Sequence, residues 1–177
     1  MLFSARSLWT MFHGIALGGA ALLGLAAALF ALYLLREPDF RAAGADKTAG
    51  TFALLAAFTA ATTWLTALVG TYIVFPLYRM TPPEGATDLT AFPRALILSD
   101  PETEWLHRFA METKEHVPFI AAILATTVAF IAWRYREAIF RERPLRRMCA
   151  LMLGLCFAAV AYVSLLGVFV NNVAPVE

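Results

Sequence analysis

Four long apolar runs separated by short polar connections dominate the sequence. They cover Leu8 to Leu35, Phe52 to Tyr78, a third run that ends at Trp133, and Met148 to Val170. Each run has close to the roughly 20 apolar residues that a helix needs to cross the hydrocarbon core of a bilayer. The pattern predicts an all-α integral membrane protein, a four-helix bundle with helices at about residues 8–35, 52–78, 101–142 and 147–170.

The connections between the runs are rich in proline, glycine and charge, as in REPDFRAAGADK, RMTPPEGATD and RERPLRR. No repeat or separate soluble segment stands out, so we expect residues 1–177 to form a single transmembrane domain. The first run is longer than the apolar part of a signal peptide, and Arg36 follows it directly. We therefore expect this run to be retained as a helix.

The composition agrees with a membrane protein. Hydrophobic residues make up 60% of the chain and charged residues only 15%, and the mean hydropathy is +0.68. The basic stretch RYREAIFRERPLRR fits membrane topology and contact with anionic lipid better than nucleic-acid binding. We expect the lipid bilayer as a partner and no nucleic acid.

The distribution of lysine and arginine predicts the orientation. Most of these residues lie in the two connections on one side of the predicted spans: Arg36, Arg41, Lys47, Arg134, Arg136, Arg141, Arg143, Arg146 and Arg147. The positive-inside rule places this side in the cytoplasm. Both termini and the long loop between residues 79 and 100 are then extracytoplasmic (N-out, C-out), which in a bacterial inner membrane is the periplasmic face.

The third helix differs from the others because charged residues precede its apolar run. The stretch SDPETE predicts a helix start near Pro101 with Asp100 as its N-cap. The uncharged part, from Val117 to Trp133, is shorter than the first two runs. We expect this helix to extend beyond the bilayer and to be kinked at Pro118, which lacks the N–H that would bond the carbonyl of Lys114.

The charged residues at the start of this run are Glu112, Lys114, Glu115 and His116. If the third helix enters the membrane at the same level as its neighbours, these side chains lie inside the protein. Ionisable groups at such depth usually mark a functional site. The alternative is a solvated extension in which Arg108, Glu112 and His116 form ordinary i,i+4 pairs.

The three histidines of the chain, His13, His107 and His116, fall at the same end of the first and third helices. From His13, a stripe of small residues continues at i+3 and i+4 steps through Ala16, Ala20 and Gly24, and could admit either a neighbouring helix or a flat ring. Depth along the helices favours His13 and His116 as a ligand pair, with His107 as a reserve ligand.

These residues suggest a haem b between two helices, with the imidazoles as axial ligands. Lys114 and Arg108 could pair with its propionates, Glu112 or Glu115 could orient a ligating histidine or transfer protons, and Asn171 and Tyr78 could support the site. In outline the arrangement resembles the four-helix cytochrome b subunits of quinone-linked respiratory complexes. A quinone could use the same groups without haem, and either cofactor implies an electron-transfer subunit.

Two other functions are open. His13, His116 and Glu112 form a set of two histidines and one carboxylate that could bind iron, zinc or copper without a porphyrin. The chain could instead be an accessory or structural subunit of a larger respiratory or photosynthetic complex. The charge cluster would then pair with other membrane subunits, and the long outer loop would dock a periplasmic electron carrier. The sequence does not decide whether the chain is an enzyme.

The second and fourth helices carry inward polar faces. Thr59, Thr62, Thr63, Thr66 and Gly70 share one face of the second helix, and Ser164, Gly167 and Asn171 share one face of the fourth. We expect most of these hydroxyls to bond backbone carbonyls of their own helix. Cys149 and Cys156 lie too far apart along their helix for a disulfide, so we expect them to be packing residues.

Overall fold

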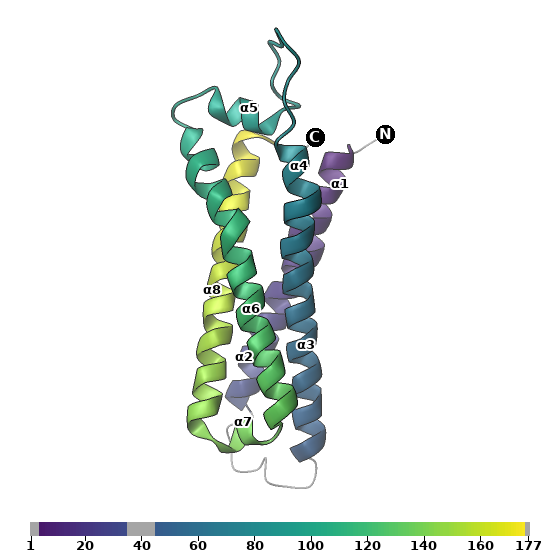
Figure 1. The fold of residues 1–177 in the computed structure, drawn as a ribbon, viewed down its shortest axis with the longest axis vertical. Helices are drawn as coiled ribbons and strands as arrows, with labels where there is room; N and C mark the ends of the chain where they lie inside the picture. The colour runs from purple at the N-terminus through teal and green to yellow at the C-terminus, as the bar shows by residue number, and fades with distance from the viewer. Residues whose placement is uncertain (1–3, 35–44, 176–177) are drawn as a thin grey trace.

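The computed structural model describes residues 4–34 and 45–175, and all regular secondary structure in these ranges is helical (Figure 1). Four helices are long and apolar enough to cross a membrane: Ala5–Leu34, Lys47–Tyr78, Leu106–Tyr135 and Arg143–Val173. We call them the first to fourth spans. The prediction of an all-helical chain with four membrane-length apolar helices is confirmed for the described residues.

Three of the spans combine α-helical and π-helical segments. The first consists of α1 (Ala5–Met11), the π-helical η1 (Phe12–Gly18) and α2 (Gly19–Leu34). The second consists of α3 (Ala45–Val69), the π-helical η3 (Gly70–Val74) and α4 (Phe75–Tyr78), and the third of the π-helical η4 (Leu106–Met111) and α6 (Glu112–Tyr135). The fourth span is a single helix, α8 (Arg143–Val173).

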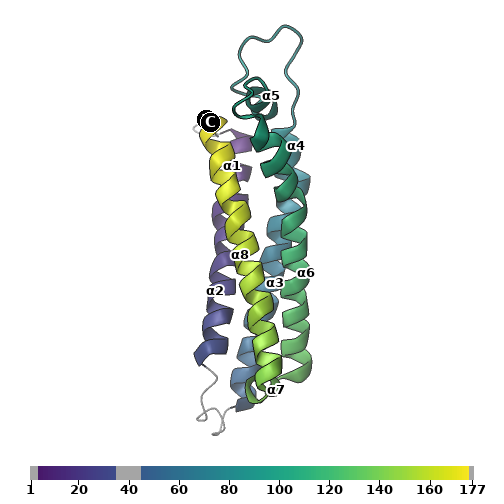
Figure 2. The same ribbon diagram turned by 90° about the vertical axis from the view of Figure 1, so that its left-hand side faces the viewer.

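The four spans lie side by side along the long axis of the molecule (Figures 1 and 2). Helix α3 packs against α6 and α2, and α8 packs against α6 and α2. The short helix α5 (Pro93–Leu98) lies at one end, with the first and last described residues, and α7 (Ala138–Arg141) lies at the other. We call these the α5 end and the α7 end.

Hydrogen bonds from Arg6 connect three parts of the chain at the α5 end. One guanidinium nitrogen donates to the carbonyl of Pro175 at 2.8 Å, and the other donates to the carbonyl of Ala91 at 3.3 Å. The start of the first span, the end of the fourth span and the loop before α5 are therefore held together.

The third span is shorter than the sequence suggested. Its helix ends at Tyr135, because Arg136 has a positive φ of 39° and the chain turns through α7 to start α8 at Arg143. At the α5 end, residues 101–103 form a turn instead of regular helix. The carboxylate of Asp100 still accepts the backbone N–H of Glu102 at 2.8 Å, so it stabilises this turn as a cap would.

Buried apolar residues form two separate core clusters. The larger one occupies the half of the molecule near the α7 end and includes Leu25, Phe52, Val128 and Leu153. The smaller one lies near the α5 end and includes Tyr78, Ile97, Leu106, Met111 and Leu166. The space between the two clusters is where the polar residues of the spans meet.

The threonine-rich face of the second span points inward, as predicted. Thr59, Thr62 and Thr63 are buried, and their hydroxyls donate to carbonyls of their own helix. Cys149 and Cys156 are fully buried free thiols, which confirms them as packing residues. Large apolar side chains cover the outside of all four spans, where lipid would contact them, for example Leu23, Leu54, Phe130 and Leu151.

Candidate functional site

A cavity of about 460 Å³ lies between the two core clusters and is lined by all four spans. This volume is within the usual range of sites for small organic ligands. The cavity extends along the spans from the level of Ala21, Thr63 and Val160 to the level of Tyr78 and Asn172. It therefore occupies the half of the spans near the α5 end. Its main polar lining residues are His13, Tyr78, Lys114, Glu115, Ser164 and Asn171.

The cavity reaches the side of the molecule between the first and fourth spans. Ile15 and Val168 line the cavity, yet their side chains are 72% and 55% exposed. In a membrane this side faces lipid. A ligand dissolved in the bilayer could therefore enter without passing through water.

His13 lies on η1 and faces the second span. Its ring packs against Gly70, the first residue of η3, where a Cβ atom would come within 2.7 Å of the ring atom Cε1. The Nδ1 atom is buried and has no hydrogen-bond partner among the described residues. Buried nitrogens are usually bonded in proteins, so this unpartnered nitrogen is an exception in the folded chain.

Lys114 enters the same cavity from α6. Its Nζ atom lies beside Gly167 of α8, where a Cβ atom would be only 2.8 Å away. Lys114 forms no ion pair with any carboxylate in the part of the chain that the structure describes. Its charge is close enough to His13 to interact with it. The first and third spans thus present two nitrogen groups to one cavity, each with room provided by a glycine of a neighbouring span.

Tyr78 connects the cavity to His107. The phenol of Tyr78 lines the cavity, is only 6% exposed, and shares a hydrogen bond with Nδ1 of His107 at 3.0 Å. His107 itself does not line the cavity and is half-buried near the α5 end. The histidine that the sequence left as a reserve ligand therefore lies behind Tyr78.

All three π-helical segments of the described residues contribute to the lining: His13 and Gly18 come from η1, Gly70 and Val74 from η3, and Met111 from η4. Such segments are rare and occur frequently at functional sites. In η1, the π-helical hydrogen bonding also changes which residues lie on the same face of the helix. After His13, the cavity is lined by Gly14, Ile15, Gly18 and Ala21, and not by Ala16 or Ala20. A π-helix connects residue i to i+5, so Gly18 shares the face of His13. The predicted small-residue face is wrong on this point.

The charged cluster of the third span is divided between two faces. Lys114, Glu115 and Pro118 line the cavity, whereas Glu112 and His116 are exposed on the outside of the helix. His116 donates from Nδ1 to the carbonyl of Glu112 at 2.8 Å, within its own helix. The structure therefore does not bring His116 together with His13. In residues 4–34 and 45–175, no group of three or more histidine, cysteine or acidic side chains could hold a metal ion.

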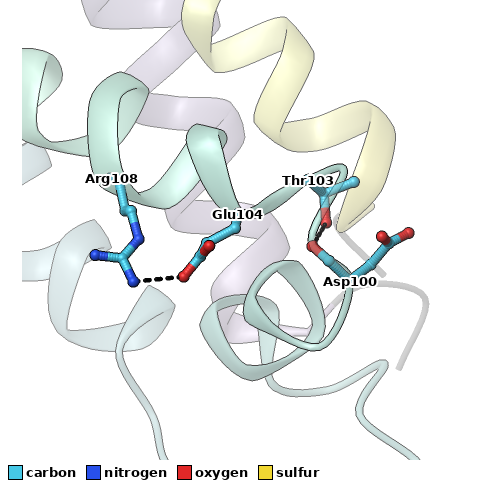
Figure 3. Close-up of polar contacts among 4 residues, drawn as sticks. All are labelled: Asp100, Thr103, Glu104 and Arg108. Carbon is cyan, nitrogen blue, oxygen red and sulfur yellow. Dashed lines mark hydrogen bonds and ion pairs between the residues drawn. The ribbon is translucent and has the colours of Figure 1, made fainter.

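Arg108 also points away from the cavity. Its guanidinium forms an ion pair with Glu104, one turn earlier, at 2.6 Å, and its side chain is 73% exposed (Figure 3). Arg108, Glu112 and His116 are all exposed, and Glu104 pairs with Arg108. Part of the predicted cluster thus lies on the surface, and only Lys114 and Glu115 face the interior.

The sequence analysis named His13, Tyr78, Lys114, Glu115 and Asn171, all of which line the cavity. It did not name Met111, an apolar residue whose side chain is buried and also lines the cavity. A signal was present, because Met111, Lys114, Glu115 and Pro118 recur at the i, i+3, i+4, i+7 spacing of one helix face. Comparisons with protein-family models, with curated proteins and with solved structures found no match to this chain.

Proposed function

We propose that the chain is a membrane-embedded subunit of an electron-transfer system that binds a quinone in the cavity. The observation that carries the proposal is the placement of His13 and Lys114, from the first and third spans, at one cavity that opens toward lipid. A quinone is soluble in the bilayer, has a flat apolar ring, and accepts hydrogen bonds at its carbonyl oxygens. Its chemistry fits the cavity in each of these respects.

The side chains of the cavity can bind the ring and handle its protons. His13 and Lys114 can donate hydrogen bonds to carbonyl oxygens, and Ile15, Val74 and Met111 can pack against the ring. Reduction of a quinone takes up two electrons and two protons. The electrons come from a redox partner, either another membrane subunit or a carrier outside the membrane. His13 can exchange a proton with the oxygen that it contacts, and Tyr78, which is hydrogen-bonded to His107, can relay protons toward the cavity.

The geometry favours a quinone over a haem held by two histidines. Of the three histidines, only His13 lines the cavity, and His116 lies on the opposite face of its helix. A porphyrin between His13 and His116 therefore has no support from their placement. The same placement gives no support to a metal site made from His13, His116 and Glu112.

We also propose the orientation in which the α5 end is extracytoplasmic. Arg134, Arg136, Arg141, Arg143, Arg146 and Arg147 surround α7. By the positive-inside rule the α7 end faces the cytoplasm, and the four spans form a bundle with its cavity in the outer half of the bilayer. A kink of α6 at Pro118, which lines the cavity, would add space there. In a bacterial inner membrane the outer half faces the periplasm.

Analysis of the purified full-length chain for bound quinone tests the proposal. The protein would be purified in detergent and in lipid nanodiscs, extracted with organic solvent, and assayed by mass spectrometry. We expect near-stoichiometric quinone in the wild type. His13→Ala should weaken quinone binding by about tenfold, the equivalent of one lost hydrogen bond to a buried group. His116→Ala is the matched control, because His116 is exposed outside the cavity.

A visible spectrum of the same samples separates the alternatives. A Soret band that disappears in both His13→Ala and His116→Ala would replace the quinone with a haem held by two histidines. A colourless wild type that neither retains quinone nor binds it when it is added would overturn the proposal.

A further inference from the structure

The ammonium group of Lys114 faces the cavity and has no acidic partner among the described residues. No described carboxylate lies within ion-pair distance of its Nζ atom. Glu115 also lines the cavity, but its carboxylate interacts with Glu112, His116 and Arg79 rather than with Lys114. The charge of Lys114 acts on His13, which can only add positive charge. The described lining around Lys114 is therefore short of negative charge.

The end of the Lys114 side chain lies against a glycine of α8. The Nζ atom lies in the space beside Gly167, where a Cβ atom would be 2.8 Å away, so a larger residue at position 167 would displace the end of the lysine side chain. Ser164 and Asn171, one turn before and one turn after Gly167, line the cavity beside it. Because the Ser164 hydroxyl already donates to the carbonyl of Val160, the amides of Asn171 and Asn172, which also line the cavity, are the donors on α8 that can supplement the ammonium.

A cation inside a membrane protein is stable when an anion or several strong acceptors pair with it. We infer that the ligand of this cavity carries an acidic oxygen, either an ionised ring hydroxyl or a carboxylate, that pairs with Lys114. The inference rests on the proposed function for the ring and the lipid-side entry. It adds that the ligand is an acidic amphiphile and not a neutral one.

Two quinones that differ in the methylation of one ring hydroxyl, and therefore in acidity, test this inference. One is a hydroxynaphthoquinone with an alkyl tail, whose ring hydroxyl is ionised at neutral pH. The other is its methyl ether, which has the same ring and tail. Binding of each to the full chain in nanodiscs would be measured by calorimetry. We expect the ionised compound to bind about tenfold more tightly to the wild type, since hydrogen bonds to charged groups are stronger than neutral ones.

Substitutions at and near Lys114 assign the preference to its charge. Lys114→Gln should remove the preference by weakening the ionised compound alone, and Lys114→Arg should retain most of it. His116→Ala, on the outer face, should leave it unchanged. Size-exclusion chromatography and a thermal melt would show that each variant is folded. If Lys114→Gln does not fold, the comparison of the two compounds on the wild type still decides the point.

The outcomes separate this inference from the proposed function. Equal affinity for the two quinones overturns the inference and leaves quinone binding intact. If neither quinone binds, the proposed function fails, and a long-chain carboxylate and the corresponding alcohol then test the inference alone. Tighter binding of the carboxylate that is lost in Lys114→Gln would support it, and equal or absent binding of both would overturn it.

Discussion

The imidazole of His13 occupies the space that Gly70 leaves open on the neighbouring span. A Cβ atom at position 70 would lie 2.7 Å from Cε1, 3.2 Å from Nε2 and 3.4 Å from Nδ1 of the ring. Gly70 also begins η3, and His13 lies within η1, so two π-helical segments meet at this contact. The contact therefore connects the π-helical segments to His13, the side chain on which the proposed function depends.

Gly70→Ala should displace His13 and weaken quinone binding, because the methyl group would occupy the position of the ring. We expect a loss of about tenfold, similar to that of His13→Ala, with little change in stability. In a His13→Ala background the second substitution should cost little more, as expected for two residues that act through one contact. Calorimetric titration of the four variants measures this.

Gly19→Ala is the control for Gly70→Ala, since a Cβ atom at position 19 would meet nothing within 4 Å. If both glycine variants weakened binding equally, the effect would come from helix rigidity and not from the position of His13.

Gly24→Ala should destabilise the packing of the first span on the second. A Cβ atom at position 24 would lie 2.7 Å from Oγ1 and 3.5 Å from Cα of Thr59, which is fully buried. Overpacking of this kind costs about 1–3 kcal/mol. A thermal melt in detergent should show a lower midpoint than the wild type.

Two further variants identify the cause of that loss. Gly154→Ala, where a Cβ atom would meet nothing within 4 Å, should melt like the wild type. Thr59→Ala combined with Gly24→Ala should recover much of the stability, because it removes the closest atom. No recovery would show that the backbone of α3 is the obstacle.

Tyr78→Phe should leave quinone binding nearly unchanged and slow the proton steps. The substitution removes the hydroxyl between the cavity and Nδ1 of His107 but keeps the ring. The lost hydrogen bond should cost about 1 kcal/mol of stability. Under the proposed function, reduction of bound quinone by added dithionite, followed by stopped-flow absorption in nanodiscs, should become slower in the variant. An unchanged rate would show that protons reach the ring without Tyr78 and His107.

The four spans were predictable because their signal is spread over many residues. A long apolar run is recognisable whatever its neighbours are, and the threonine face of the second span repeats at helical spacing. The end of the third span was less predictable, since the charged residues after Trp133 suit either a longer helix or the observed turn at Arg136.

The pattern of apolar and polar residues did not predict which side of its helix each site residue lies on. Lys114 and His116 are two residues apart, so a helix points them to different sides. The sequence analysis grouped them by chemistry, whereas the structure separates them by face. The residues after His13 were misassigned because the face was extended at α-helical steps through a segment that is π-helical. A hydrophobicity pattern cannot show such a change of hydrogen bonding.

Cysteine labelling tests which side of the membrane the cavity faces. Both native cysteines, Cys149 and Cys156, are fully buried, so they should react slowly with an impermeant maleimide. Glu84→Cys, in the exposed loop at the α5 end, and Glu142→Cys, between α7 and α8, place one thiol at each end of the spans. In intact cells Glu84→Cys should react and Glu142→Cys should not, and permeabilised cells should label both. The reverse result would place the α5 end in the cytoplasm. The cavity would then lie in the inner half of the bilayer, the redox partner would be sought on the cytoplasmic side, and the arginines around α7 would break the positive-inside rule.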